Sequence, residues 1–320
     1  MANRHQRVGL WPPIVAMTLI AIVGSRAAPA SCAQSLWVAN ESDNNIVQIR
    51  PGVGAVANPL GIAFDKANNA WITTGGDFVE EFSAGQLKHL GTTPSPSPKA
   101  TIAITPMESM VGLAFDKGGN LWAADEHGGG AIHKLSKRQL AAGGADVTPA
   151  VSITSTSIGC PQFVSFDKAG NLWVSDECKN TIFEFKRNHL TASGNKTPDV
   201  AISGHMSDPG QMAFDTQGNL WVTSANDSKV VEFAKSTLSS SGSPTPGIIL
   251  SSDGASPASL DDPFGLAFDA SGDLWICNYN GNTVAEFSPA QIAASGNPAP
   301  IALIPGIFNE AYQITFGPAL

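Results

Sequence analysis

One phrase recurs five times along the 320 residues of this chain, and it constrains the fold more than any other feature. It reads FDKANNAWITT, FDKGGNLWAAD, FDKAGNLWVSD, FDTQGNLWVTS and FDASGDLWICN, beginning at Phe64, Phe115, Phe166, Phe214 and Phe268. The separations between these phenylalanines are 51, 51, 48 and 54 residues. A period near 50 residues with short β-rich segments is typical of propeller blades rather than of helical solenoids.

Each repeat unit predicts four strands. Around Phe166 they fall at 162–167, 172–176, 181–185 and 199–203, and the linking DKAGN carries the Asp and Gly of a tight hairpin turn. A second refrain, SPAQIAASGNPAPIALI, follows the third strand. In it, Ser288 and Pro289 resemble a helix N-cap and first helical residue, and Gly296 resembles the end of that turn. We expect the fourth strand to be an outer edge, where the prolines that open it are tolerated.

The two ends of the chain predict how the propeller closes. SLWVANESDNNIVQI at 35–49 supplies a second and a third strand without a first, and AYQITFGPAL at 311–320 supplies a first strand without a second. We therefore predict an all-β, six-bladed β-propeller over 34–320, whose first blade is completed by 311–320. One tryptophan then belongs to each blade: Trp37, Trp71, Trp122, Trp173, Trp221 and Trp275.

Residues 1–33 resemble a secretory signal peptide. Arg4 and Arg7 precede an apolar stretch at 10–24, and small residues precede a cleavage point after Ala33. Pro12 and Pro13 interrupt the apolar stretch, which is short for a membrane anchor. We expect an exported, periplasmic or extracellular monomer with no transmembrane segment in the mature chain.

The repeat pattern resembles NHL-repeat six-bladed propellers and, more distantly, the gluconolactonase and virginiamycin B lyase families. The resemblance covers the whole mature chain and implies the fold rather than an activity, because propellers host many unrelated functions. Gluconolactonase-like propellers hold a divalent metal with acidic or amide residues at the entrance of the first strand. The corresponding residues here are not acidic: Leu60, Val111, Gln162, Gly210, Phe264 and Tyr312. That metal site is therefore expected to be absent.

Virginiamycin B lyase-like proteins carry an LWFTE motif and use His and Glu around a magnesium ion. The resemblance places Asp125 and Asp176 at the position of that Glu, with Asn40 and Asn278 as related polar substitutions. No histidine of this chain falls at the entrance of a first strand.

The cysteines predict one disulfide bond. Cys160 and Cys178 lie at equal distances along the chain from Ala169, the middle of a hairpin turn, so antiparallel pairing would bring them opposite each other. An exported protein favours the bond. The alternative is that Cys178 lies in a loop and points away. Cys277 falls where a small packed residue is expected.

Charge divides the propeller into two faces. The chain has 18 Lys and Arg against 27 Asp and Glu, a net charge of -9, which argues against nucleic acid as a partner. Loops that enter the first strand share one face, which we call the loop face, with loops between the second and third strands. Its acidic residues are Glu41, Asp43, Asp77, Glu108, Asp125, Glu126, Asp176, Glu177, Asp208, Asp227, Asp261, Asp262 and Glu310, and its main cations are Lys179 and Lys229.

The opposite face carries the hairpin turns, and we call it the turn face. We expect it to be the more basic of the two, with Lys88, Lys137, Arg138, Lys186, Arg187, Lys196 and Lys235.

The loop face is the predicted functional surface. Its candidate ligand-binding residues are Asn40, Asp125, His127, Gln162, Asp176, Asn226, Phe264, Asn278 and Tyr312, and its candidate metal ligands are Asp125, Asp176, His205 and Asp208. His127 and His205 could serve with these aspartates as acid and base. Two alternatives stay open: the apolar centre could be a plug in the channel, and the acidic loops could be ordinary solvated loops.

These observations favour an exported, non-catalytic propeller that binds a small molecule or a protein partner through the loop face. The alternative is a divalent-metal-dependent lyase or lactonase that uses the same face, with calcium or magnesium as its cofactor. A third reading is a purely structural module of the cell envelope. No catalytic residue and no cofactor is assigned, because the chain has no GxSxG, HExxH, CxxC or phosphate-loop motif.

Overall fold

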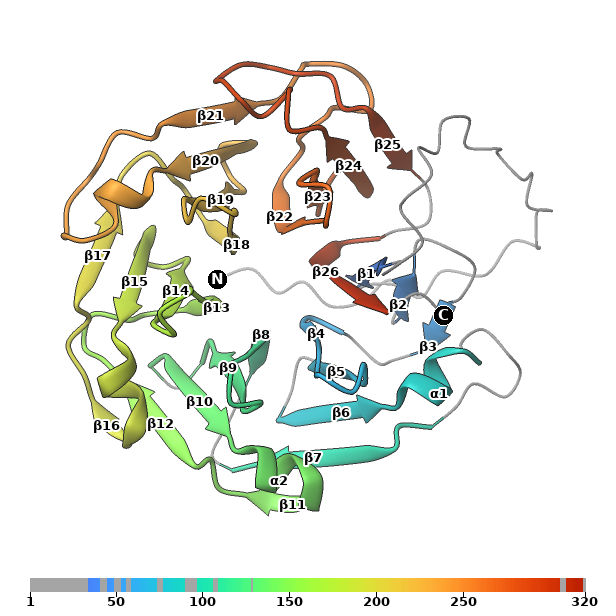
Figure 1. Cartoon of the computed structure of the whole chain (residues 1–320), viewed down its shortest axis with the longest axis vertical. Helices are drawn as coiled ribbons and strands as arrows, with labels where there is room; N and C mark the ends of the chain where they lie inside the picture. Colours follow the sequence, from blue (N-terminus) through green and yellow to red (C-terminus); the bar gives the residue numbers. More distant parts are fainter. Residues whose placement is uncertain are drawn as a thin grey trace, which may run out of the picture. The chain divides into compact units, whose positions relative to one another are not determined.

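Every copy of the recurring phrase folds into the inner half of an antiparallel sheet (Figure 1). The computed structural model describes residues 34–40, 45–48, 53–55, 59–73, 77–89, 97–105, 109–127, 129–305 and 309–318. The predicted signal peptide and the predicted loop-face acids Glu41, Asp43 and Glu108 lie outside these residues. Over the described part of the chain, no helix has the length and apolar character needed to cross a bilayer.

Five blades are each built from one continuous stretch of chain, and we name each by its innermost strand. From the inside outward, the first blade has β4 (Ile62–Phe64), β5 (Ala70–Thr73), β6 (Phe78–Phe82) and β7 (Ala100–Ile104), and the second has β8 (Met110–Phe115), β9 (Leu121–Asp125), β10 (Ala131–Leu135) and β12 (Val151–Thr154). The third has β13 (Pro161–Phe166), β14 (Leu172–Asp176), β15 (Thr181–Phe185) and β17 (Val200–Ser203), and the fourth has β18 (Pro209–Phe214), β19 (Leu220–Ser224), β20 (Lys229–Phe233) and β21 (Ile248–Ser251). The fifth has β22 (Pro263–Phe268), β23 (Leu274–Asn278), β24 (Thr283–Phe287) and β25 (Ala302–Pro305). The predicted all-β propeller fold is confirmed.

The turn between the first two strands explains why the spacing of residues is nearly the same in every copy of the phrase. In the β8 blade, Asp116 Oδ1 accepts the backbone N–H of Asn120 at 2.9 Å. Asp116 Oδ2 accepts from Asn120 Nδ2 at 2.8 Å and from Trp122 Nε1 at 3.0 Å. Gly119 takes φ +80°, where a side chain would be strained. The Asp, Gly, Asn and Trp are thus the parts of one turn, and they carry no chemistry of their own.

The lysine of the phrase links neighbouring blades. Lys66 Nζ donates to the carbonyl of Lys117 at 2.9 Å, Lys117 Nζ donates to the carbonyl of Lys168, and Lys168 Nζ donates to the carbonyl of Thr216 at 3.0 Å. The Trp and Phe of the phrase link neighbouring blades in the core, since Trp122 packs edge-on against Phe166 of the next blade with ring centroids 5.9 Å apart. The repeated phrase therefore joins blades as well as building them.

Four of the outer strands, β7, β12, β17 and β21, are not free edges, which corrects our expectation. The β4 blade carries the short helix α1 (Ala84–Leu87). After the short helix α2 (Lys137–Ala142) of the β8 blade, and after the 3-10 helix Arg187–Thr191 of the β13 blade, the chain runs back along the preceding blade. β11 (Gly144–Val147) pairs parallel with β7, and β16 (Gly194–Asn195) pairs parallel with β12. Gly296 bridges Leu250 in the same way, so it straps the β18 blade instead of only ending a turn. Local propensity could not predict this pairing, because its partner lies about one blade away in sequence.

The two ends of the chain form one further sheet, in the order β26 (Ala311–Pro318), β1 (Gln34–Asn40), β2 (Asn45–Gln48) and β3 (Val53–Ala55). β1 and β26 are antiparallel, with Leu36 opposite Phe316. Our prediction of six blades is corrected to five, because the structure has five continuous blades and this composite sheet, built from both ends of the chain, differs from them. Only four residues separate β2 from β3, too few for the helical turn and strap that the other blades carry.

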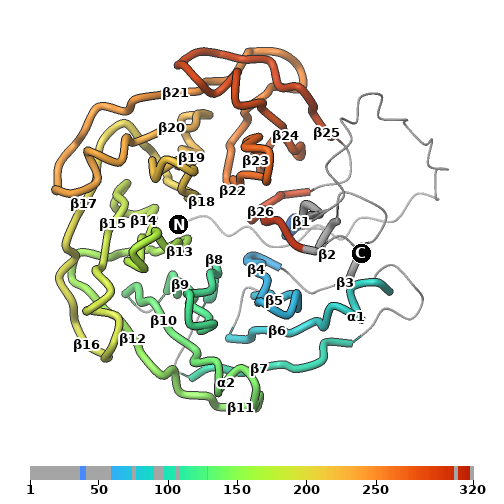
Figure 2. Tube along the Cα trace, in the orientation of Figure 1, coloured from blue at the N-terminus to red at the C-terminus, as the bar shows by residue number. Residues whose placement is uncertain are grey.

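Glutamine side chains close the centre of the fold. Gln211 Oε1 accepts the backbone N–H groups of Leu266 and Ile314 at 3.1 and 3.2 Å, and its Nε2 donates to the carbonyl of Ile314 at 3.0 Å. Gln313 similarly links Ile62 and Leu113 of the β4 and β8 blades. Figure 2 shows the innermost strands around this centre. These bonds satisfy backbone groups across the channel, so its interior is a packed core.

Candidate functional site

The loop-face end of the centre is floored by apolar and aromatic side chains, which we call the mouth floor. They form one buried cluster: Leu60, Val111, Phe163, Ala225, Phe264 and Tyr312, with Tyr279 packed against them. Most come from the predicted position four residues before each anchor phenylalanine. In the β18 blade this position is Gly210, where a Cβ would lie 2.5 Å from the carbonyl oxygen of Phe264. The predicted apolar centre is thus assembled from successive inner strands.

Three aromatic rings dominate the exposed part of the floor. The Phe264 ring centroid lies 4.4 Å from that of Tyr312 and 5.9 Å from that of Tyr279, and the two tyrosine rings are 6.1 Å apart. Phe264 and Tyr312 expose 8% and 9% of their surface, and Tyr279 is half-buried. The floor is therefore largely buried, and Tyr279 is the most exposed of the three rings.

Four carboxylates stand around the floor, and we call them the mouth carboxylates. Glu126 and Glu177 immediately follow β9 and β14, while Asp208 and Asp262 immediately precede β18 and β22. Within each of these blades a backbone bond joins the loop before the first strand to the loop after the second strand, as in the 3.0 Å bond from the Ala225 N–H to the Asp208 carbonyl. Asp208 and Asp262 take φ of +57° and +54°, a region that ordinary residues seldom occupy. The same blade position is therefore acidic and left-handed in two neighbouring blades.

The mouth carboxylates are close enough to affect one another. Burial raises the pKa of Asp208 to about 7, and the negative charges of Glu177, Asp262 and Glu126 add to this effect. The Oδ1 atom of Asp208 is enclosed and has no hydrogen-bond partner among the described residues. Burial, followed by the charge of Glu177, also raises the pKa of Glu126. A positive charge arriving at this place would therefore be favoured.

Gln162 connects the carboxylates to the floor. Its side chain is 2% exposed, its Nε2 donates to Glu177 Oε2 at 2.8 Å, and its Oε1 accepts from the Tyr312 hydroxyl at 2.6 Å. The amide can make both bonds in only one orientation, so it orients Tyr312 as a donor and Glu177 as an acceptor.

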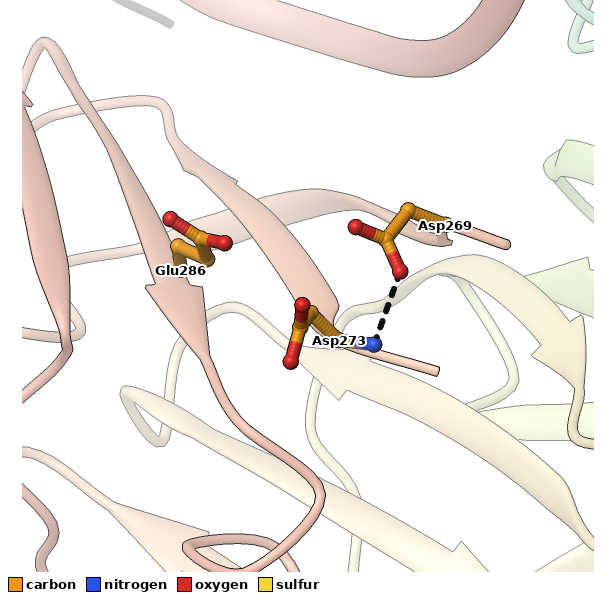
Figure 3. A group of neighbouring side chains, drawn as sticks. All are labelled: Asp269, Asp273 and Glu286. Atoms are coloured by element: carbon orange, nitrogen blue, oxygen red, sulfur yellow. Dashed lines mark hydrogen bonds between the residues drawn. The ribbon is translucent and has the colours of Figure 1, made fainter. Parts of the chain in front are cut away.

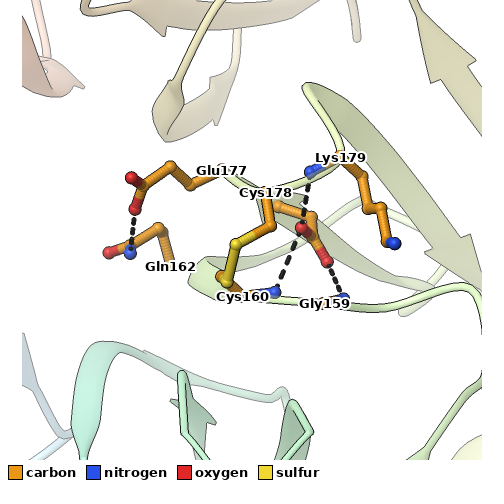
Figure 4. The surroundings of a disulfide bond; sticks show 7 residues. Gly159, Cys160, Gln162, Glu177, Cys178 and Lys179 are labelled. Atoms are coloured by element: carbon orange, nitrogen blue, oxygen red, sulfur yellow. Dashed lines mark hydrogen bonds between the residues drawn. A yellow bond between two sulfur atoms is a disulfide. The ribbon is translucent and has the colours of Figure 1, made fainter. Parts of the chain in front are cut away.

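The predicted disulfide is confirmed, and it holds the loop that carries Glu177. Cys160 and Cys178 are bonded (Figure 4). Asp176 accepts the backbone N–H groups of Gly159 at 2.6 Å and Lys179 at 3.0 Å. Cys277 is buried and free, as expected of a small packed residue, and burial raises the pKa of its thiol to about 12.

Four of the predicted ligand residues are fully or almost fully buried and brace loops. Asp125 accepts the Ser109 N–H at 3.0 Å, Asn40 accepts the Asn309 N–H at 2.6 Å, and Asn278 Nδ2 donates to Thr283 at 2.8 Å. Asp176 braces the disulfide loop, as described above. Their neighbours Glu126, Glu177 and Tyr279 reach the mouth instead, because successive side chains of a strand point in opposite directions. The alternation of side chains along a strand was the feature of the sequence that could have identified Glu126, Glu177 and Tyr279 as mouth residues.

The remaining predicted residues divide between the floor and the surface. Gln162, Phe264 and Tyr312 belong to the mouth floor or contact it. His127, Asn226 and His205 are exposed. The predicted metal set of Asp125, Asp176, His205 and Asp208 is not brought together, since Asp125 and Asp176 are turned into their own loops.

A group of carboxylates with the spacing of a metal site lies elsewhere. Among the described residues, only Asp269, Asp273 and Glu286 offer ligand atoms that all lie within 4.8 Å of one another (Figure 3). Asp269 and Asp273 belong to the turn of the β22 blade and Glu286 to β24, and four other blades place Asn at the position of Asp273. Burial and then the charges of Asp273 and Asp269 raise the pKa of Glu286 to about 7.

Three grooves on the described surface lie away from the mouth. Grooves of about 470, 510 and 410 Å³ separate neighbouring blades beside the hairpin turns, and each is lined by the Trp of one blade and the anchor Phe of the next. Because equivalent residues line all three, they follow from the repeat. We give more weight to the mouth, where the blades differ from one another.

No protein-family model and no curated protein matches the chain. By structure it is similar to a protein of unknown function from Bacteroides caccae, with a TM-score of 0.66 and 13% identity over 89% of this chain and 98% of that one. It is also similar to a catalytically inactive virginiamycin B lyase from Staphylococcus aureus with quinupristin, with a TM-score of 0.54 and 14% identity over 87% and 86% of the two chains. Likenesses at these identities show the propeller fold alone.

Proposed function

We propose that the protein is a non-catalytic, ligand-binding β-propeller that recognises a positively charged ligand at the mouth. The observation that carries this proposal is the convergence of Glu126, Glu177, Asp208 and Asp262, from four successive blades, on one aromatic floor. Ligand sites commonly combine an apolar floor with a few polar groups that converge on it. Of the nine residues predicted from the sequence, Gln162, Phe264 and Tyr312 are retained in this site.

The charge of the site supports a cationic ligand. Asp208 is influenced by three other carboxylates and by burial, and every one of these influences raises its pKa. Lys229, one of the two lysines expected on the loop face, is engaged by Asp227 at 2.9 Å. A cation bound at the mouth would relieve the repulsion among the carboxylates, whereas an anion would increase it.

A lyase or lactonase activity on this face stays the alternative. The likeness to a virginiamycin B lyase supports the shared fold and not the activity. No specific observation at the mouth favours catalysis over binding.

We test the proposal with a thermal-shift panel of small cationic, neutral and anionic ligands. Cationic ligands should raise Tm, since a ligand that binds only the folded state stabilises it by mass action. Glu177→Gln should reduce this shift, and Asp227→Asn, which changes a loop-face carboxylate outside the mouth, should not. Equal shifts with neutral ligands, or a full shift in Glu177→Gln, would contradict the proposal.

We also propose that the composite sheet serves as a sixth blade and that the mature, exported chain is a monomer. Contacts of Trp275 with Phe316 and of Trp37 with Phe64, at 6.3 and 5.6 Å, continue the Trp–Phe pattern of the other blades. The Cys160–Cys178 disulfide is consistent with export. N-terminal sequencing of the secreted protein should begin near Gln34, and sedimentation should give a monomer; retention of residues 1–33 would contradict the export proposal.

A further inference from the structure

Resting on the proposed binding function of the mouth, we propose that its ligand is an organic cation. Its alkylated ammonium group would sit against Phe264, Tyr279 and Tyr312 and be surrounded by the mouth carboxylates. The inference narrows the ligand from any positive charge to one chemical class, and it separates that class from a bare metal ion.

The aromatic rings supply the first argument. Phe264, Tyr279 and Tyr312 come from three different segments and are mutually inclined by 46° to 77°, so ring faces of different orientation meet at one place, with Tyr279 the most exposed of the three. An ammonium group over such faces gains about 0.5–2 kcal/mol from cation–π attraction. Methyl groups on the nitrogen would also bury apolar surface against the same rings.

The spacing of the carboxylates supplies the second argument. No three mouth carboxylates bring ligand atoms within 4.8 Å of one another, although the described Asp269 group on the turn face does. A calcium ion requires several oxygens at about 2.3–2.6 Å, so these carboxylates would have to converge to bind it. An alkylated ammonium spreads its charge over a larger volume and needs no direct coordination. The observed spacing therefore suits the organic cation.

Asp208 supplies the third argument. Its enclosed Oδ1 has no hydrogen-bond partner among the described residues, and a buried charged group without a partner is costly. The negative charges of Glu177, Asp262 and Glu126 all act on this carboxylate. A diffuse cation at the mouth would stabilise this oxygen without having to donate a hydrogen bond.

The raised pKa of Asp208 also implies that binding at the mouth depends on pH. The titratable groups that influence one another at the mouth are Asp208, Glu126, Glu177 and Asp262, and the charge of His127 acts on Glu126 in the opposite sense. Because Asp208 loses its proton near pH 7, the negative charge of the mouth grows between pH 6 and 8. Affinity for the organic cation should rise over that interval by several-fold.

A matched pair of probes tests the inference. Choline and 3,3-dimethylbutan-1-ol have nearly the same shape, and only choline is charged. We expect NMR titration of the full-length protein, as processed by its expression host, to give at least tenfold tighter binding of choline. Tyr279→Leu should weaken choline binding about three- to tenfold, whereas Tyr279→Phe should retain it. Asp208→Asn should remove the pH dependence, and the control Asp227→Asn should not.

The outcomes separate this inference from the proposed function. Any of three results would overturn the organic-cation inference and leave a mouth ligand site standing. These are equal affinities for the two probes, choline binding that Tyr279→Leu leaves unchanged, and shifts of the mouth resonances with calcium chloride but not with choline. If no cationic probe shifts the mouth resonances, both proposals fail. Unligated Tm values of each variant exclude misfolding as the cause.

Discussion

At the scale of single residues, one step along the chain separates a bracing side chain from a mouth side chain. Asp125 and Asp176 end their strands and accept backbone N–H groups of neighbouring loops, while Glu126 and Glu177 reach the mouth. The sequence shows that acidic residues follow these strands. Which of two adjacent acids reaches the mouth depends on the register of the strand end. The site residues were therefore predictable to within one position.

The first prediction concerns Asp208. Its folded pKa lies near 7 and its unfolded value near 3.8, so the folded state holds the proton more tightly. Wild-type stability should fall as pH rises from about 4 to about 7 and then level off. Asp208→Asn removes this loss, and Asn also tolerates the left-handed backbone. We expect a gain of roughly 1–3 kcal/mol at pH 8 and little change at pH 4 in urea unfolding; an equal effect at both pH values would contradict it.

The second prediction concerns Asp273, the exception to the Asn found in four other blades. Its carboxylate raises the pKa of Glu286, so wild-type stability is lost as pH rises from about 4.5 to about 7. Asp273→Asn removes one of the three like charges and restores a donor to Asp269. Calorimetry should show a higher Tm at pH 8 and a smaller gain at pH 4. A lower Tm at pH 8 would show that the carboxylate is needed there.

At the scale of elements, local pairing was predictable and distant pairing was not. The β13–β14 hairpin and its disulfide followed from the symmetry of Cys160 and Cys178 about the turn. The parallel straps did not, because β11 and β16 pair with strands of the preceding blade through Gly-containing segments that show no strand pattern. Such contacts become favourable only once the neighbouring blade has formed.

The third prediction concerns the disulfide, which closes a segment with a sequence separation of 18. Cross-linking a loop of this length restricts the unfolded chain and contributes about 3 kcal/mol. The Cys160→Ser/Cys178→Ser double variant should therefore lose about that much in urea unfolding. Dithiothreitol should destabilise the wild type similarly and leave the double variant unchanged. A double variant as stable as the oxidised wild type would contradict this account.

At the scale of the whole molecule, the period of the repeat predicted the propeller, because Trp–Phe contacts and turn residues must recur in every blade. The details of the composite sheet could not be predicted, since two separate segments supply it and the segment between β2 and β3 is too short for a strap. The channel glutamines were also missed as structural elements. A half-buried or buried amide that bonds two or three backbone groups, as Gln211 and Gln313 do, resembles any other glutamine in a sequence.

The fourth prediction tests those glutamines. Gln211→Leu and Gln313→Leu would each leave buried backbone groups of two inner strands without partners. An unsatisfied buried group costs about 1–3 kcal/mol, so each variant should lose at least that much in a single cooperative transition. The exposed Gln217→Leu serves as the control and should change stability little. Unchanged stability in both channel variants would show that the centre is not held by these bonds.

The most direct test of the central claim is a crystal structure of the protein soaked with choline at pH 8. The account predicts electron density for the ammonium group over Phe264, Tyr279 and Tyr312, and loss of that density in Tyr279→Leu. Choline density confined to the grooves between blades, with the mouth empty at saturating concentration, would contradict it.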